Sequence, residues 1–425
     1  MELQQIDPVL EAFDRLRLRE AKARYGDTAS TFLTKFQSIA ASLQPDEKIK
    51  LEVSYTHETM ELLKAVLADP QANKICSLRW RYNGKEDVNP VLPLLINNCP
   101  ELASLEVYFK HHSAFDFVSS VFDHPNNRIK VLDISPNTKD DLARFFAALG
   151  QSQVSALALS IGDSSEFYQG LYEYLAKDLL VRLKVWTNFE QVPPEMMVSL
   201  VDCTRLAELK LVECKFSQPT AFSHLPKSIT TLTLDSCRFV GSLDWSFLAD
   251  SNVRELDLYN VKGVDGNQLG SALALHLRAK GLDKLRFAYC GFVNETLAKV
   301  GVEIGRIKRL ILAHSNLNDT SVELIALALQ SPNSEMKELV LLYDYTATSI
   351  EDHLVPALKH SNCNLVKLSL HTDHHTEAAG RVEAMFHNRL ALFVLLQARQ
   401  VRRRSPCPLR RLPVEMFRLV GKVLI

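Results

Sequence analysis

The chain has 425 residues, of which 47% are hydrophobic and 23% are charged, and its 49 basic and 50 acidic side chains nearly cancel. This balance excludes a disordered or collagen-like chain. A formal charge of -1 also excludes a general attraction to nucleic acid or acidic membranes, so a charged partner would have to recognise a local patch.

The first 27 residues mix charges of both signs and lack the apolar core of a secretory signal peptide. No uncharged apolar run approaches the roughly 20 residues that a membrane-spanning helix needs. Eight cysteines are scattered along the chain without a CxxC pair. Together these features predict a reduced intracellular protein, cytosolic or nuclear, that does not contact a membrane.

Two stretches with a helical apolar pattern, residues 10–21 and 30–43, predict helices near the start of the chain. A strand over residues 49–55 and a helix over residues 57–68 are expected next. Because a repeat array needs a cover over its terminal apolar face, we expect residues 1–70 to form an N-terminal helical cap.

From residue 75 onward the pattern L-x-x-L-x-L-x-x-(C/N/S)-x-L recurs, most clearly in LAELKLVECKF and LDKLRFAYCGF. Successive copies begin 23 to 29 residues apart, within the ~20–29 residues that are typical of leucine-rich repeats. Twelve copies begin at Ile75, Leu102, Ile129, Val154, Leu180, Leu206, Ile229, Val253, Leu282, Ile307, Met336 and Leu365.

Each part of the pattern has a physical reason. The L-x-L step is a short strand whose alternate side chains enter the core. The residue three places after the second leucine leaves the strand, and a small thiol there can bond to unpaired backbone groups, as we expect for Cys214, Cys237 and Cys290. Between strands, DTSVELIALALQ predicts a helix capped by Asp319 or Thr320.

Two central copies, from Leu206 and Ile229, span only 23 and 24 residues. They leave little room for a full helix, so we expect short or 3₁₀ turns there.

The passage IKRLILAHSNLNDTSVELIALALQSPNSEMKELVL, residues 307–341, resembles the ribonuclease-inhibitor-like subclass of leucine-rich-repeat proteins. It has a strand, a turn, an aspartate opening a helix, an I-A-x-A-L helix core and the next strand. The resemblance covers about residues 75–375. It implies an α/β fold: a leucine-rich-repeat solenoid, or horseshoe, with a parallel concave sheet, outer helices and helical caps at both ends. Residues 71–375 would form this repeat domain, with about twelve repeats.

In such a solenoid the positions between and just after the strand leucines face outward on the concave side. Tyr, Trp and Arg side chains in such places are those that most often dominate protein interfaces. The candidates for binding a protein partner on this face are Arg79, Tyr82, Tyr108, Phe109, Lys184, Trp186, Asp235, Glu255, Asp257, Tyr259, Arg286, Tyr289, His314 and Tyr343.

Residues 376–425 depart from the repeat pattern and end in LRRLPVEMFRLVGKVLI. A proline in the first turn and an apolar stripe predict a helix, which either caps the last repeat or docks to another protein. LPVEMFRLV resembles the opening helix of F-box motifs, and a helix, a break and an LP-helix are similar to a SOCS box. Both resemblances imply recruitment of ubiquitin-ligase core subunits. The docking-helix candidates are Leu412, Pro413, Glu415, Met416, Leu419 and Val420.

Two further clusters have simpler interpretations. The arginine run at 402–404 is either a solvated connector or a nuclear-import signal. The histidines at 371, 374 and 375 lack the spacing of metal ligands and are interpreted as a solvated loop. We therefore expect no metal and no cofactor, and nucleic acid is not an expected partner.

The chain has no phosphate loop, dinucleotide motif, nucleophile elbow or catalytic cysteine signature, so we do not expect an enzyme. The leading hypothesis is an intracellular protein–protein interaction scaffold that binds a partner on the concave face. The alternatives are a substrate receptor of a ubiquitin ligase, and a regulator of a small GTPase or other enzyme. The Ran GTPase activator, a solenoid of the same repeat type, is an example of such a regulator.

Overall fold

The computed structural model describes residues 17–23, 28–44, 47–54, 59–85, 87–110, 113–125, 127–135, 142–160, 165–218, 220–223, 225–342, 349–360, 362–371 and 382–386. The chain divides into two compact units, Met1–Phe247 and Leu248–Ile425. Each unit contains parallel strands joined by helices or turns, and each has the architecture of a leucine-rich-repeat solenoid.

The N-terminal unit builds its main sheet from strands that are neighbours in sequence order. These strands are β1 (Arg17–Lys22), β2 (Glu47–Ser54), β3 (Ile75–Tyr82), β4 (Ser104–Phe109), β5 (Val131–Ser135), β6 (Ala156–Ser160), β7 (Arg182–Trp186), β8 (Glu208–Val212) and β10 (Thr231–Asp235). The helices between them are α2 (Ala29–Ala41), α3 (Thr59–Leu67), η1 (Pro70–Lys74), α4 (Val91–Asn98), α5 (Ala114–Phe122), α6 (Leu142–Gln151), α7 (Ser165–Leu175) and α8 (Pro194–Ser199). β9 (Lys215–Phe216) and β11 (Arg238–Phe239) pair in a small second sheet.

The C-terminal unit continues the same alternation of strand and helix. Its strands are β12 (Glu255–Tyr259), β13 (Leu282–Ala288), β14 (Ile307–Ala313), β15 (Glu338–Leu342) and β16 (Lys367–His371). Its helices are α10 (Gly266–Lys280), α11 (Val293–Val300), η2 (Gly301–Arg306), α12 (Asp319–Gln330), η3 (Ile350–Leu354) and α14 (Val355–Lys359), and α9 (Phe247–Asp250) lies at the boundary in the sequence. A further helical stretch covers residues 382–386.

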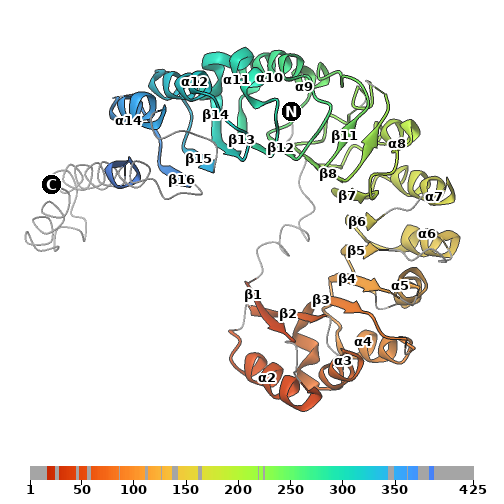
Figure 1. Cartoon of the computed structure of the whole chain (residues 1–425). Coiled ribbons are helices and arrows are strands. Elements are labelled where there is room, and N and C mark those ends of the chain that lie inside the picture. The colour runs from red at the N-terminus through yellow and green to blue at the C-terminus, as the bar shows by residue number, and fades with distance from the viewer. Residues whose placement is uncertain are drawn as a thin grey trace, which may run out of the picture. The chain divides into compact units, whose positions relative to one another are not determined.

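All twelve predicted copies of the repeat contain a strand. Neighbouring strands pair in parallel with leucine opposite leucine, as Leu209 is opposite Leu232, and both side chains are fully buried. Within each unit the helices lie along one face of the sheet, and no helix among the described residues lies over the opposite face (Figure 1). We call this second face the open face. Alternation along the strands places every second side chain on it.

The thiols that follow the strands occupy the predicted place. Cys214, Cys237 and Cys290 are buried, and their Sγ atoms donate to carbonyl oxygens of the preceding strand or repeat, for example Cys237 to Leu211 at 3.4 Å. The prediction that the two short central copies lack a full helix is also confirmed, since the copy from Ile229 contains only the four-residue helix α9. The described residues between β8 and β10 contain β9 and turns but no helix.

Two predictions of local structure were wrong. The expected helix over residues 10–21 ends in strand β1, which pairs in parallel with β2. Ala21 is buried between exposed Glu20 and Lys22, an alternation typical of a strand, so the sheet begins upstream of residue 70. The cap of α12 is neither Asp319 nor Thr320. Asn318 caps it, because its side chain accepts a hydrogen bond from the Ser321 N–H.

Candidate functional site

Two rows of side chains cross the open face of the N-terminal unit. The strand register places Glu106 of β4, Asp133 of β5, Ala158 of β6 and Lys184 of β7 side by side in the first row. Two residues further along the strands, a second row contains Arg81, Tyr108, Ser160 and Trp186. Because successive strands in a sheet are ~4.8 Å apart, side chains in one row can interact across one or two strands.

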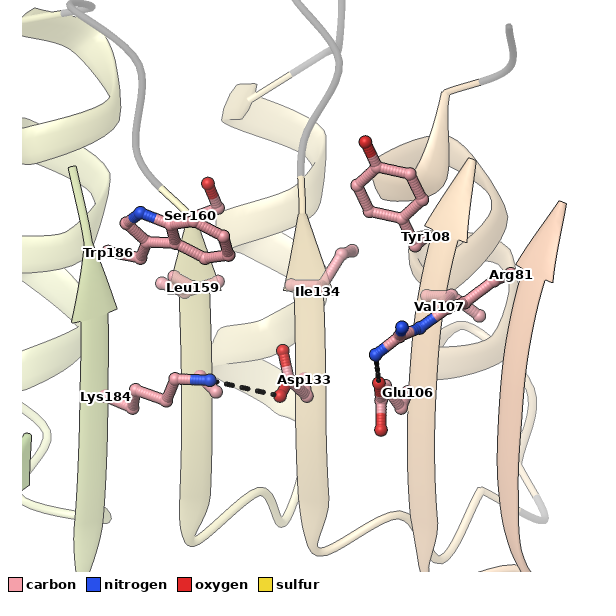
Figure 2. Close-up of a pocket in the computed structure, with 11 residues that line it drawn as sticks. Arg81, Glu106, Val107, Tyr108, Asp133, Ile134, Leu159, Ser160, Lys184 and Trp186 are labelled. Atoms are coloured by element: carbon pink, nitrogen blue, oxygen red, sulfur yellow. Dashed lines mark hydrogen bonds and ion pairs between the residues drawn. The ribbon is translucent and has the colours of Figure 1, made fainter. Parts of the chain in front are cut away.

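The charged side chains of the first row form ion pairs with their neighbours. Glu106 pairs with Arg79 and with Arg81, whose Nη2 is 3.0 Å from Oε1. Lys184 Nζ reaches across β6 to within 3.7 Å of Asp133 Oδ2, because Ala158 between them is small (Figure 2). Part-exposed pairs of this kind stabilise a fold by only ~0–1 kcal/mol each, so their main effect is on the charge pattern of the face.

A hollow of about 280 Å³ lies on this face between Tyr108 and Trp186. The two side chains are 42% and 41% exposed, and Figure 2 shows the Trp186 ring over the strand of Ser160 and the Tyr108 ring on the side of its strand that faces Ile134. The hollow exists because β6 presents only Ala158 and Ser160 to the open face. The indole of Trp186 is held in place, since its Nε1–H donates to Glu213 Oε2 at 2.6 Å.

Asp133 lies in the wall of the hollow between the two aromatic side chains. Burial raises the pKa of its carboxyl above the ordinary value, against the opposing effect of Lys184. The charge on Asp133 is therefore only partly compensated by the protein.

A second aromatic cluster lies at the strand ends of the C-terminal unit. The rings of Tyr289 and His314 stack with centroids 4.4 Å apart and an interplanar angle of 7°. Tyr259 meets Tyr289 edge to face at 5.3 Å, and the Arg286 guanidinium lies 5.5 Å from the Tyr259 ring centroid. Asp257 pairs with Arg286 at 3.3 Å and with Lys284 at 3.6 Å. The cluster combines part-exposed rings with a cation that is already paired.

The conformation of the strand ends positions these rings. Tyr289 and His314 have φ of 56° and 50°, in the left-handed region that side chains other than glycine rarely adopt. Their N–H groups donate to Ala313 and Leu342 of the next strand at 2.8 and 2.9 Å. Glu213, Ser236 and Asn260 have similar φ at the same place in their own repeats. The conformation therefore belongs to the repeat and is not special to the aromatic residues.

The structure places eleven of the fourteen candidates on the open face as follows. Tyr108, Trp186 and Tyr289 are exposed, and the part-buried or ion-paired ones are Arg79, Lys184, Asp235, Glu255, Asp257, Tyr259, Arg286 and His314. Tyr343 and the docking-helix candidates Leu412, Pro413, Glu415, Met416, Leu419 and Val420 lie outside the described residues.

Tyr82 and Phe109 do not face outward, and this part of the prediction was wrong. They are 5% and 2% exposed, and Phe109 packs against Trp80 with ring centroids 4.7 Å apart. Both continue the inward alternation that begins at Leu78 and Leu105, since β3 and β4 run beyond the second apolar residue of the pattern. Arg81, Ala158 and Ser160 were missed as contributors to the hollow, although the same alternation places them outward.

Within the described residues, no group of three or more His, Cys, Asp or Glu side chains could hold a metal ion. The helices in this part of the chain include none that is both long enough and apolar enough to cross a membrane.

Comparisons with known proteins concern the architecture. No family model and no curated protein matches the sequence. Among solved structures, the chain is similar to the plant peptide hormone receptor RGFR1 in complex with RGF2, at 11% identity over 77% of this chain and 55% of that one, with a TM-score of 0.33. It is similar to TLR13 in its complex with ssRNA13, at 14% identity over 77% and 53%, with a TM-score of 0.40.

A third structure is the leucine-rich-repeat ectodomain of the Arabidopsis thaliana receptor kinase GASSHO1/SCHENGEN3 with CASPARIAN STRIP INTEGRITY FACTOR 2. Its identity is 13% over 76% of this chain and 40% of that one, with a TM-score of 0.30. The chain thus spans about half the length of the structures that it resembles.

Proposed function

We propose that the chain is a protein-binding leucine-rich-repeat scaffold that receives its partner on the open face of the N-terminal unit. The observation that supports this proposal is the pair of exposed aromatic side chains, Tyr108 and Trp186, on either side of a hollow. Large exposed aromatic rings beside a concavity are the anchors that most often dominate protein interfaces. The cluster of Tyr259, Tyr289 and His314 would supply a second contact surface in the C-terminal unit.

The test is capture of partners from cell lysate on immobilised full-length protein, followed by mass spectrometry. We expect a Tyr108→Ala/Trp186→Ala double variant to lose the partner that the wild type retains, since loss of a central aromatic anchor weakens binding by about 30-fold. Val198→Ala is the control, because Val198 is 55% exposed on α8, away from the open face. Both variants should unfold at the wild-type temperature. A double variant that captures every wild-type partner in equal amount would contradict the proposal.

The chain would act without chemistry of its own, as an intracellular scaffold. A substrate receptor of a ubiquitin ligase is a second candidate, supported by the resemblance of LPVEMFRLV to docking helices, in a segment outside the described residues. A regulator of a small GTPase or other enzyme is a third, supported only by the repeat type. In each case the substrate, or the regulated enzyme, would be the partner held on the open face.

A further inference from the structure

We propose that the hollow between Tyr108 and Trp186 is a receptor for an arginine side chain of the protein partner. This inference rests on the proposed function, and it specifies the chemistry of the partner at one site. Four observations support it: the aromatic walls, the long ion pair of Asp133, the close pairing of Glu106 with two arginines and the exposure of the Lys184 side chain.

The walls suit a planar cation. The faces of Trp and Tyr attract cations within ~6 Å of the ring centroid, and a guanidinium can also stack flat on them. In Figure 2 the Trp186 ring lies over β6 and the Tyr108 ring lies between β4 and β5, so that a side chain entering the hollow would lie between the two rings. The hydrogen bond from Trp186 to Glu213 fixes one wall before the ligand arrives.

The carboxylate of Asp133 has hydrogen-bond acceptor sites that no side chain of the described residues occupies. An ionised carboxylate can accept about four hydrogen bonds. Its cationic neighbour Lys184 forms an ion pair with it at 3.7 Å from Oδ2, longer than the ~2.7–2.9 Å of a strong charge-assisted hydrogen bond. Burial already raises the pKa of Asp133, which means that the hollow disfavours its bare charge. The Asp133 side chain is 45% exposed, so its remaining acceptor sites are open to solvent, and a guanidinium with five N–H donors can bind there in place of water.

The other charges of the hollow favour a cation over an anion. Glu106 is already bound by Arg79 and Arg81, so the arginine nearest to the hollow is occupied. A carboxylate entering the hollow would find Arg81 and Lys184 engaged with the acids of the protein and would add a third negative charge beside them. An entering guanidinium displaces only Lys184, whose side chain is 38% exposed and can turn to solvent.

Selection from a random 12-residue peptide library displayed on phage, with the full-length chain as bait, tests the inference. We expect arginine to be enriched among peptides bound by the wild type, and the enrichment to be lost with Asp133→Asn and with Trp186→Ala. Asp123→Asn is the matched control, since Asp123 ends helix α5 and pairs with Arg144 at 3.3 Å, away from the open face. It should retain the enrichment.

A selected peptide then allows a direct measurement. Trp80 and Trp245 are buried, so a change in tryptophan emission on binding reports on Trp186. Replacing the arginine of the peptide by citrulline, which has the same shape without the charge, should weaken binding by about tenfold or more, because a hydrogen bond to a charged group is lost. The same replacement should weaken binding to the Asp133→Asn variant less, because only the attraction of the rings for the cation is then lost.

Three outcomes would overturn the inference: enrichment of acidic peptides, arginine enrichment that survives Asp133→Asn, or equal affinity for the citrulline peptide. The results also distinguish the proposed binding of a protein on the open face from the proposed binding of arginine in the hollow. If Trp186→Ala abolishes peptide binding while Asp133→Asn does not, the hollow binds protein but not through arginine. If no selected peptide depends on Trp186, the hollow is not the binding site and both proposals are wrong.

Discussion

At the scale of single residues, the cysteines show how completely the repeats bury their interior. Cys76, Cys99 and Cys203 are buried, and burial raises the pKa of their thiols to about 11, about 12 and about 12. Cys214, Cys237 and Cys290 are buried after the strands, and Cys363 is part-exposed. Since the thiolate is the reactive species, the buried cysteines should be inert while the chain is folded.

Thiol labelling tests this. At pH 8, a thiol with a pKa of about 12 has a thiolate fraction of roughly 10⁻⁴, so an alkylating reagent should modify Cys99 and Cys203 only through unfolding. Peptide mapping after brief exposure should show Cys363 labelled in the native protein and the other described cysteines labelled only in denaturant. Rapid native labelling of Cys203 would contradict the burial of its repeat.

His276 should make the C-terminal unit sensitive to acid. It is fully buried in α10, with Nδ1 2.7 Å from the Leu248 carbonyl oxygen and Nε2 2.8 Å from that of Val253. Burial lowers its pKa, the two carbonyl groups oppose this, and nearby Lys280 and Arg254 lower it further. The folded state therefore binds the proton less tightly than the unfolded chain does, where the pKa is ~6.5.

It follows that the contribution of His276 to the free energy of unfolding is constant above about pH 7 and decreases as the pH falls through ~6.5, by at most ~1.4 kcal/mol per pH unit. Urea unfolding at pH 7.5 and pH 5.5 measures the change. His276→Gln removes this titration, so the variant should lose less stability between the two pH values than the wild type. An equal loss in both proteins would show that His276 does not contribute.

Side-chain alternation explains how far the candidate site could be predicted from sequence. Tyr108 and Trp186 were found because each directly follows an inward apolar residue of its strand. Tyr82 and Phe109 were misplaced because the repeat pattern stops at the second leucine, whereas β3 and β4 continue beyond it. The hollow itself was not predictable from the pattern. It depends on small residues on β6, Ala158 and Ser160, being beside large residues on strands that are distant in sequence.

At the scale of elements, close packing of helices α10 and α11 depends on glycine. A methyl group on Gly270 would lie 2.7 Å from the Thr296 carbonyl oxygen and 2.7 Å from Lys299 Cβ. One on Gly291, which precedes α11, would meet no atom within 4 Å. The two positions therefore form a matched pair for a test of helix packing.

We expect Gly270→Ala to lower the free energy of unfolding by about 1–3 kcal/mol, because the helices must move apart. Gly291→Ala should change it by less than about 0.5 kcal/mol. Chemical denaturation followed by circular dichroism measures both. If Gly270→Ala were as stable as the wild type, helix propensity would have offset the clash, and the helices would be less tightly packed than described.

The strands that were predicted contain the paired leucines of the repeat, whereas the strand that was missed does not. The strands of the twelve copies were predicted because paired leucines mark them. Strand β1 was missed because RLREAK contains one leucine and four charged residues, which fit a helix surface equally well. Its strand conformation comes from pairing with β2, a long-range interaction that the local sequence does not encode.

At the scale of the whole molecule, the end of the array needs a cover, since each repeat buries its apolar face against the next. Val382 and Phe386, in the helical stretch after β16, are each 3% exposed, and Glu383 accepts a hydrogen bond from the Leu370 N–H of β16. These contacts support the proposal that the first part of residues 376–425 caps the last repeat.

Two truncated chains separate capping from docking. A chain ending at His375 lacks Val382 and Phe386, whereas one ending at Asn388 retains them. We expect the shorter chain to be less stable by about 3–5 kcal/mol, the usual effect of losing a buried phenylalanine. The longer chain should unfold in the same range of denaturant as the full-length protein. If both truncated chains were equally stable, Phe386 would not act as a cover.

The same pair of chains tests the ubiquitin-ligase alternative without the complication of misfolding. Both lack residues 409–425, but only the chain ending at His375 also loses the proposed cover. If LPVEMFRLV docks to a ligase core, full-length protein should capture cullin-type subunits from lysate, and the stable chain ending at Asn388 should not. That chain should still capture the open-face partner, because the hollow between Tyr108 and Trp186 lies in the other unit. Capture of ligase subunits by the chain ending at Asn388 would exclude the tail as their docking site.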